Sequence, residues 1–153
     1  MGSSEFILRR AAADDACRIL ELIQELADFE KEPDAPSLSK EQLILDGFSE
    51  SPRFEVTLAE VGSEVVGMSL VYERYSTWMG RSLYLEDLIV SESHRGIGIG
   101  KALMEAAIKK AREGDYSRLE WQVLDWNTSA IDFYKQLGAE LDESWINCRI
   151  AFE

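Results

Sequence analysis

Apolar and polar residues repeat with two different periods along the chain, and the changes of period mark the expected elements. The run FILRR over 6–10 is typical of a short strand. Apolar residues then recur at helical spacing as far as Phe29, which predicts an amphipathic helix. Asp14 and Asp15 precede this helix and are expected to cap it. The chain therefore opens with a strand that leads into a helix.

A second helix and a series of strands are expected beyond a polar connection over 30–40. Ser39 and Gln42 form a capping-box pattern for a short helix that ends near Gly47. From Phe54 the apolar positions alternate, and the GSE turn signal over 62–64 predicts an antiparallel hairpin. The remaining elements are expected to be a strand over 82–90, a helix over 99–113, a strand over 118–124, a helix over 128–137 and a strand over 145–152.

This order predicts a mixed α/β fold. Helices come first, an antiparallel meander follows, and the chain ends in β-α-β-α-β order. With 153 residues and no second boundary in the pattern, the chain is expected to form one domain over 1–153, with residues 1–4 flexible.

The charge balance bears on the partners. The formal net charge is −13, and a polyanionic surface repels the phosphates of nucleic acids and attracts cations. Nucleic-acid binding is therefore disfavoured and a basic small molecule is favoured. The alternative is that the acidity serves only solubility.

Several other classes are disfavoured by composition. No apolar run approaches the roughly 18 residues that span a bilayer, and the N-terminus has no secretory pattern, so a cytoplasmic protein is expected. No metal is expected, because two distant cysteines and one histidine offer few zinc ligands. Cys17 is expected to be a small packing residue of the first helix.

Gly96, Gly98 and Gly100 stand between an expected strand and an expected helix. The stretch RGIGIGKA is not a Walker A loop, because its glycines are too close and Ala102 follows Lys101. It is not a dinucleotide fingerprint either, because Lys101 occupies the third glycine position. Bare backbone at a helix N-terminus can still bind an anion through its N–H groups. A plain glycine-rich turn is the structural alternative.

Five sequence blocks resemble one enzyme family. RGIGIG is similar to the R/Q-x-x-G-x-G/A loop of the GCN5-related N-acetyltransferases (GNAT), which holds the pyrophosphate of acetyl-coenzyme A (acetyl-CoA). LIQELADFEK, YSTWMGRSLYLED, YLEDLIV, RGIGIGKAL and LDWNTSAIDFYKQLGA resemble the spermidine/spermine (diamine) acetyltransferases, closest to the thialysine branch. The resemblance implies a single GNAT-like domain, a twisted, mostly antiparallel sheet with one β-bulged strand, about four flanking helices, and a homodimer.

The resemblance also implies where the cosubstrate acetyl-CoA is bound. Three consecutive residues of the bulged strand would pair with the pantetheine arm, the glycine loop would hold the pyrophosphate, and the start of the last helix would line the coenzyme. The implied residues are Leu88, Ile89, Val90, Arg95, Gly96, Ile97, Gly98, Ile99, Gly100, Lys101, Asn127, Thr128, Ser129, Ala130 and Tyr134.

Two catalytic residues are implied in the same way. An alkyl amine must lose a proton before it can attack a thioester, and the resemblance gives this task to Glu86, acting through water. Tyr134 would protonate the leaving thiolate. The residues alone leave other interpretations open: Glu86 and Asp87 are adjacent acids at a strand end that could simply be solvated, and Tyr134 could belong to the core.

The amine itself is expected to meet acids and aromatic rings. The implied substrate-binding residues are Phe29, Glu30, Trp78, Glu86, Asp87, Asp125, Trp126, Asn127 and Glu143. Ser76 stands where the polyamine-preferring branch has an acid, which favours a shorter or zwitterionic amine over spermine. An acetyltransferase for protein N-termini or lysines and a non-catalytic acetyl-CoA sensor are the alternatives.

Overall fold

The structure is a computed structural model that describes residues 5–152. The expectation of flexibility for residues 1–4 lies outside the described residues. The chain forms two compact units, one that ends at Gln122 and one that begins at Val123. The expectation of one domain over 1–153 stays a prediction.

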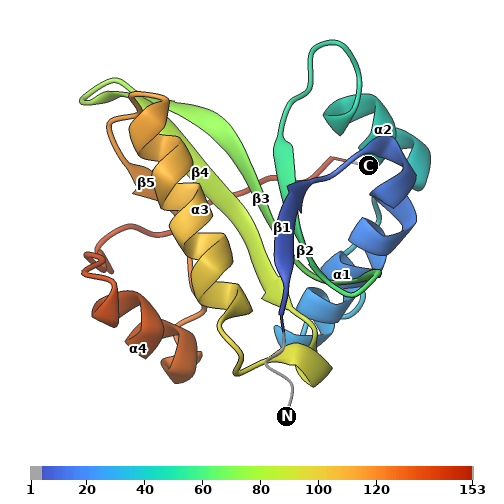
Figure 1. The fold of residues 1–153 in the computed structure, drawn as a ribbon. Helices are drawn as coiled ribbons and strands as arrows, with labels where there is room; N and C mark the ends of the chain where they lie inside the picture. Colours follow the sequence, from blue (N-terminus) through green and yellow to red (C-terminus); the bar gives the residue numbers. More distant parts are fainter. Residues whose placement is uncertain (1–4, 153) are drawn as a thin grey trace. The chain divides into compact units, whose positions relative to one another are not determined.

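A five-stranded sheet forms the centre of the first unit, with the strand order β1-β2-β3-β4-β5 (Figure 1). The strands are β1 (Ile7–Arg10), β2 (Glu55–Val61), β3 (Glu64–Ser76), β4 (Gly80–Val90) and β5 (Leu119–Glu120). The first four pair antiparallel in sequence, and β5 runs parallel to β4. The mixed α/β fold with a mostly antiparallel sheet is therefore confirmed.

Helices cover both faces of this sheet. Figure 1 shows α1 (Ala16–Phe29) and α2 (Lys40–Gly47) on one face and α3 (Ile99–Glu113) on the other. On the α1 face, Ile19 and Leu22 are buried against strand residues such as Met68. On the α3 face, Ile99 and Leu103 pack against Val66. Each helix thus buries its apolar stripe on the sheet, as its spacing predicts.

The second unit contains one helix among its described residues, α4 (Thr128–Gln136). Asn127 caps this helix, because its side-chain oxygen accepts a hydrogen bond of 3.3 Å from the main-chain N–H of Ala130. The helix predicted over 128–137 is therefore confirmed to within one residue at its end.

Two expected strands are not formed as predicted. The strand expected over 118–124 is reduced to the two residues of β5, and no strand is found over 145–152. Alternation of apolar residues supplies no hydrogen bonds by itself, and a strand needs a neighbour in register. Only Leu119 and Glu120 of the first segment find one, opposite Leu83 and Tyr84.

The helix caps also differ in part from the prediction. Ser39 does cap α2, because its hydroxyl accepts a hydrogen bond of 3.1 Å from the N–H of Gln42. The side-chain amide of Gln42 donates to Asp46 instead, so the capping box is not closed. Asp15 precedes α1 without capping it. Cys17 is exposed on α1 and is not a packing residue, contrary to expectation.

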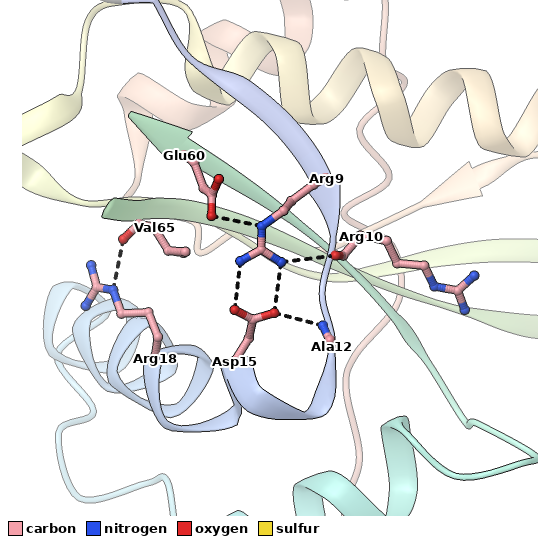
Figure 2. Close-up of polar contacts among 7 residues, drawn as sticks. All are labelled: Arg9, Arg10, Ala12, Asp15, Arg18, Glu60 and Val65. Atoms are coloured by element: carbon pink, nitrogen blue, oxygen red, sulfur yellow. Dashed lines mark hydrogen bonds and ion pairs between the residues drawn. The ribbon is translucent and has the colours of Figure 1, made fainter. Parts of the chain in front are cut away.

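The Asp15 carboxylate is instead part of an ionic network with Arg9 (Figure 2). The Arg9 guanidinium forms a fork with Asp15 at 2.8 and 2.9 Å, and its Nε donates to Glu60 of β2 at 2.8 Å. Asp15 also accepts from the N–H of Ala12 at 2.8 Å. A bidentate arginine offers the carboxylate a stronger partner than a helix N–H, which explains why capping fails. The network joins β1, β2 and the turn before α1.

Among residues 5–152, no helix is both long and apolar enough to cross a membrane.

The Arg9–Asp15 pair gives a testable dependence of stability on pH. The hydrogen bonds from Arg9 hold the pKa of Asp15 below its usual value, so the pair stabilises the folded state above pH 3.8 and loses this contribution as the carboxylate protonates at lower pH. Asp15→Asn is expected to lower the free energy of unfolding by about 1–2 kcal/mol at pH 7, since the pair is partly exposed.

Urea unfolding at pH 7 and at pH 2.5 measures this effect, with Asp14→Asn as the control because Asp14 is the exposed neighbouring acid. If Asp15→Asn lowered the free energy of unfolding by the same amount at both pH values, the assigned Arg9–Asp15 interaction would be contradicted.

Candidate active site

Strand β4 carries a β-bulge whose extra residue is Glu86. Leu85 pairs with Val71 and Asp87 pairs with Leu70, so Glu86 has no partner of its own on β3. In a regular strand Glu86 and Asp87 would point to opposite faces. The bulge turns both toward the face covered by α1: Asp87 lies opposite Leu70 of that core, and Glu86 accepts a hydrogen bond from Tyr72, which packs against the same core.

The carboxylate of Asp87 lies on this face near two other acids. Glu86 is exposed, Asp87 is half-buried, and Glu30 lies at the end of α1. Burial, followed by the charges of Glu86 and Glu30, raises the pKa of Asp87 to about 6. Burial also raises the pKa of Glu30. Within residues 5–152, no positive charge contributes to the pKa of Asp87 or Glu30, and this suits a cationic ligand.

The glycine loop follows directly from the same strand. After the turn η2 (Glu92–His94), Gly96 has φ +80° and Gly98 has φ +93°, values that other residues adopt only with strain. Gly98 is the N-cap of α3 and offers no side-chain acceptor to the helix. The N–H groups at the first turn of α3 are thus available to an anion such as a pyrophosphate.

The residues around the loop differ in whether their side chains are exposed to a ligand. Ile99 is buried, with 1% exposed, so only its main chain could meet a ligand, whereas Ile97 is exposed. Lys101 is exposed on the first turn of α3, 4.0 Å from Glu105. A Cβ on Gly100 would meet only Val90, at 3.7 Å, so the fold itself leaves room there.

The bulged strand has a free main-chain edge. Among the described residues, β5 pairs with β4 only at Leu83 and Tyr84. The N–H of Ser91 donates to Val66 of β3 at 2.8 Å, and because ladder positions alternate, the main-chain groups of Leu88 and Val90 face away from β3. Those of Ile89 face β3. Leu88 can therefore offer its N–H and carbonyl to a ligand, and Val90 can offer its N–H, since the Val90 carbonyl already accepts a hydrogen bond from Arg95 Nε.

Helix α1 contacts both ends of the segment over 91–95 that connects β4 to the glycine loop. Its Glu25 accepts from the hydroxyl of Ser91 at 3.1 Å and from the N–H of Glu92 at 3.0 Å. One turn later, the ring of Phe29 lies 5.3 Å from the guanidinium of Arg95, whose Nε donates to the carbonyl of Val90 at 2.9 Å. The Phe29 ring thus lies against Arg95 at the start of the glycine loop.

The hairpin between β3 and β4 carries Trp78. Its side chain is 86% exposed, and the hydroxyl of Ser76 accepts from the N–H groups of Trp78 and Met79 at 3.2 Å each. Ser76 therefore has a structural role in closing this turn, besides the specificity role expected from the sequence.

The remaining predicted site residues belong to the second unit. Asp125, Trp126 and Glu143 lie in its loops, and Asn127, Thr128, Ser129 and Ala130 form the cap and first turn of α4. Tyr134 is on α4, with its ring 5.5 Å from that of Phe133. Their approach to Glu86 and to acetyl-CoA stays a prediction.

The comparisons with known proteins assign the family. The sequence profile of the Acetyltransferase (GNAT) family matches residues 18–139, which include the bulged strand, the glycine loop and α4. The chain belongs to the GNAT family.

Named GNAT relatives cover most of the chain. Thialysine N-epsilon-acetyltransferase of Bos taurus is 42% identical over 142 residues, covering 88% of this chain and 84% of that protein. The enzyme of the same name from Mus musculus is 40% identical over 157 residues, covering 95% and 92%. An aminoglycoside acetyltransferase from an uncultured soil metagenomic sample, solved with trehalose, has a TM-score of 0.79 at 20% identity over 97% of each chain, and this likeness shows the fold alone.

The structure adds Tyr72 to the candidate site, a residue that the sequence did not single out. Its hydroxyl donates to Glu86 Oε1 at 2.9 Å, and its ring lies 5.4 Å from that of Tyr84. Burial and the Glu86 hydrogen bond raise the pKa of Tyr72 to about 12, so the phenol stays a donor at neutral pH. Its place in an apolar alternating strand gave no signal, because the pairing with Glu86 depends on the bulge in β4.

Tyr72→Phe is expected to reduce kcat for amine acetylation about tenfold, because an unanchored Glu86 is held less well for its expected task. Initial rates at saturating acetyl-CoA measure this, and Tyr75→Phe is the matched control, since Tyr75 is exposed on the opposite side of β3. The double variant with Glu86→Gln should be no slower than Glu86→Gln alone. Additive losses would show that Tyr72 acts independently of Glu86.

Asp87→Asn is expected to stabilise the protein at pH 7.5. A carboxyl whose pKa is raised in the folded state destabilises that state once it ionises, so the cost grows from pH 4 to pH 6 and is absent below. Thermal melts at pH 7.5 and 3.5 test this, with Glu64→Gln as an exposed control on β3. A gain in Tm that is the same at both pH values would argue against a buried, ionised Asp87.

Proposed function

We propose that the chain is an acetyl-CoA-dependent N-acetyltransferase that acetylates a primary amine of a small cationic substrate, which is a short diamine, a polyamine or a lysine-like amino acid. The observation that carries this proposal is the bulge in β4. It gathers Glu86 and Asp87 on one face of the strand whose free edge leads into the glycine loop. The thialysine acetyltransferases at 40–42% identity support an amine of this kind.

The cosubstrate would be held by main-chain groups of this chain. Leu88 and Val90 would pair with the pantetheine arm, and the loop over 95–101 would bind the pyrophosphate at the N-terminus of α3. Bound acetyl-CoA supplies a thioester as the acetyl donor. The other predicted cosubstrate residues, Ile89 and Asn127–Ala130, would line the site around it.

The acids would handle the amine. A lysine-like amine with a pKa of about 10.4 arrives protonated, and Asp87, Glu30 and Glu86 would attract it. Glu86, oriented by Tyr72, would take its proton through a water molecule, so that the neutral nitrogen attacks the thioester carbon directly. Tyr134 would protonate the departing sulfur.

The rest of the substrate would contact aromatic rings and further acids. The alkyl chain would be flanked by Phe29, Trp78 and Trp126, and more distant cationic groups would meet Asp125 and Glu143.

We further propose a cytoplasmic homodimer that needs no metal and binds no nucleic acid. The family resemblance supports the dimer, and the net charge of −13 opposes phosphate polymers. Among the described residues, no group of three or more His, Cys, Asp or Glu side chains is arranged as a metal site.

The test is coenzyme A release with acetyl-CoA and a panel of thialysine, lysine, short diamines, spermidine, spermine and a lysine peptide. Preferential turnover of a small amine is expected, with spermine poor because Ser76 provides no anion. Turnover of the peptide alone would favour an acetyltransferase for protein lysines or N-termini. Tight coenzyme binding without turnover of any acceptor would favour a sensor.

Tyr134→Phe is expected to lower kcat by about 10²-fold or more while the Kd for acetyl-CoA stays within a factor of about two, because only the proton for the thiolate is lost. Stopped-time rate assays and calorimetric titration with acetyl-CoA give the two numbers, and Tyr75→Phe is again the control. An unchanged kcat would remove Tyr134 from the mechanism and leave the function itself intact.

A further inference from the structure

Arg74 is an exposed cation on the same face of the sheet as the acids. It stands two residues after Tyr72 on β3, and because side chains alternate along a strand, both point to the same face of the sheet. Its guanidinium lies 4.8 Å from the centre of the Tyr84 ring. Within the described part of the chain, Arg74 forms no hydrogen bond or ion pair. The charge of Arg74 acts on Glu120 of β5. The Glu120 carboxylate accepts a hydrogen bond from Ser82 and forms an ion pair with Arg118.

A row of aromatic contacts connects this cation to the expected proton acceptor. Arg74 lies on Tyr84, the rings of Tyr84 and Tyr72 are 5.4 Å apart, and the Tyr72 hydroxyl meets Glu86 at 2.9 Å. Arg74 and Tyr72 are spaced by about 7 Å along the strand. One face of the sheet therefore has Glu86 and Asp87 at one end and aromatic rings in the middle, and at the other end the guanidinium of Arg74 lies near Glu120 of β5, which is bonded to Ser82 and Arg118.

This order of charges fits one type of small amine better than another. A molecule with a terminal ammonium and a carboxylate separated by an alkyl chain would match both ends. A diamine of the same length would bring its second ammonium toward Arg74, and like charges repel. Arginine is also suited to a carboxylate because its planar fork can donate two parallel hydrogen bonds.

We propose that Arg74 binds the carboxylate of an amino-acid substrate and thereby selects a lysine-like amino acid over the diamine that lacks only that carboxylate. This inference rests on the proposed function and deepens it. The assignment concerns specificity: Arg74 would touch the substrate far from the nitrogen that is acetylated, so its loss should change the choice between two amines more than the chemistry.

L-lysine and cadaverine form the matched pair for the test, because they differ only by the carboxylate. Wild-type kcat/KM with saturating acetyl-CoA should be higher for L-lysine. Arg74→Ala should lower the ratio of kcat/KM for L-lysine over cadaverine about tenfold or more. Arg74→Lys should give an intermediate ratio, since it keeps the charge but loses the fork.

The control is Arg112→Ala, which removes the same charge from an exposed position on α3, on the other face of the sheet, and should leave the ratio unchanged. Both amines are measured on one protein preparation, so any inactive fraction cancels in the ratio. Turnover of both amines with a ratio unaffected by Arg74→Ala would overturn the inference and leave the proposed function standing. Failure of the wild type to acetylate any amine would overturn both.

Discussion

The extra residue in β4 is the constraint on which the rest of the site depends. A regular antiparallel strand would separate Glu86 from Asp87 by the thickness of the sheet. The bulge shifts the register between Leu70 and Val71 and brings both carboxylates to one face, where Tyr72 can reach Glu86. The same strand then continues to the free edge at Leu88 and Val90 and to the glycine loop. One inserted residue thus sets the geometry between the acids and the expected cosubstrate site.

Helix α1 supports both parts of this arrangement. Its buried stripe anchors it to the sheet, and from this anchored position Glu25 holds the start of η2 while Phe29 packs on Arg95. Glu30, at its end, adds its charge to that of Asp87. The ionic network of Arg9 fixes the turn that leads into this helix. The acidic cluster of Glu30, Glu86 and Asp87 and the glycine loop both depend on α1, and a shift of α1 would disturb both.

The acids also show a conflict between stability and function. Asp87 is half-buried beside other negative charges, which costs free energy in the folded state when it is ionised. A chain selected for stability alone would place a neutral residue there. A bound ammonium group would offset this cost, because its positive charge stabilises the ionised form of Asp87. Arg74 stands apart from these acids, beyond two tyrosine rings, so it does not neutralise them within the site.

The sequence by itself determined most of the elements and the family. Helical spacing defined α1, α3 and α4, the GSE turn defined the β2–β3 hairpin, and the loop RGIGIG with four further blocks carried the GNAT resemblance, because these signals are local. Local signals could not show that Asp15 turns to Arg9, that a strand over 145–152 finds no partner, or that β5 is only two residues long. Nor could they show that Tyr72 meets Glu86 or that Arg74 lies on Tyr84. Those outcomes were decided by the tertiary structure, because each depends on strand register and on partners distant in the chain, which compete for the same side chain only once the sheet has formed.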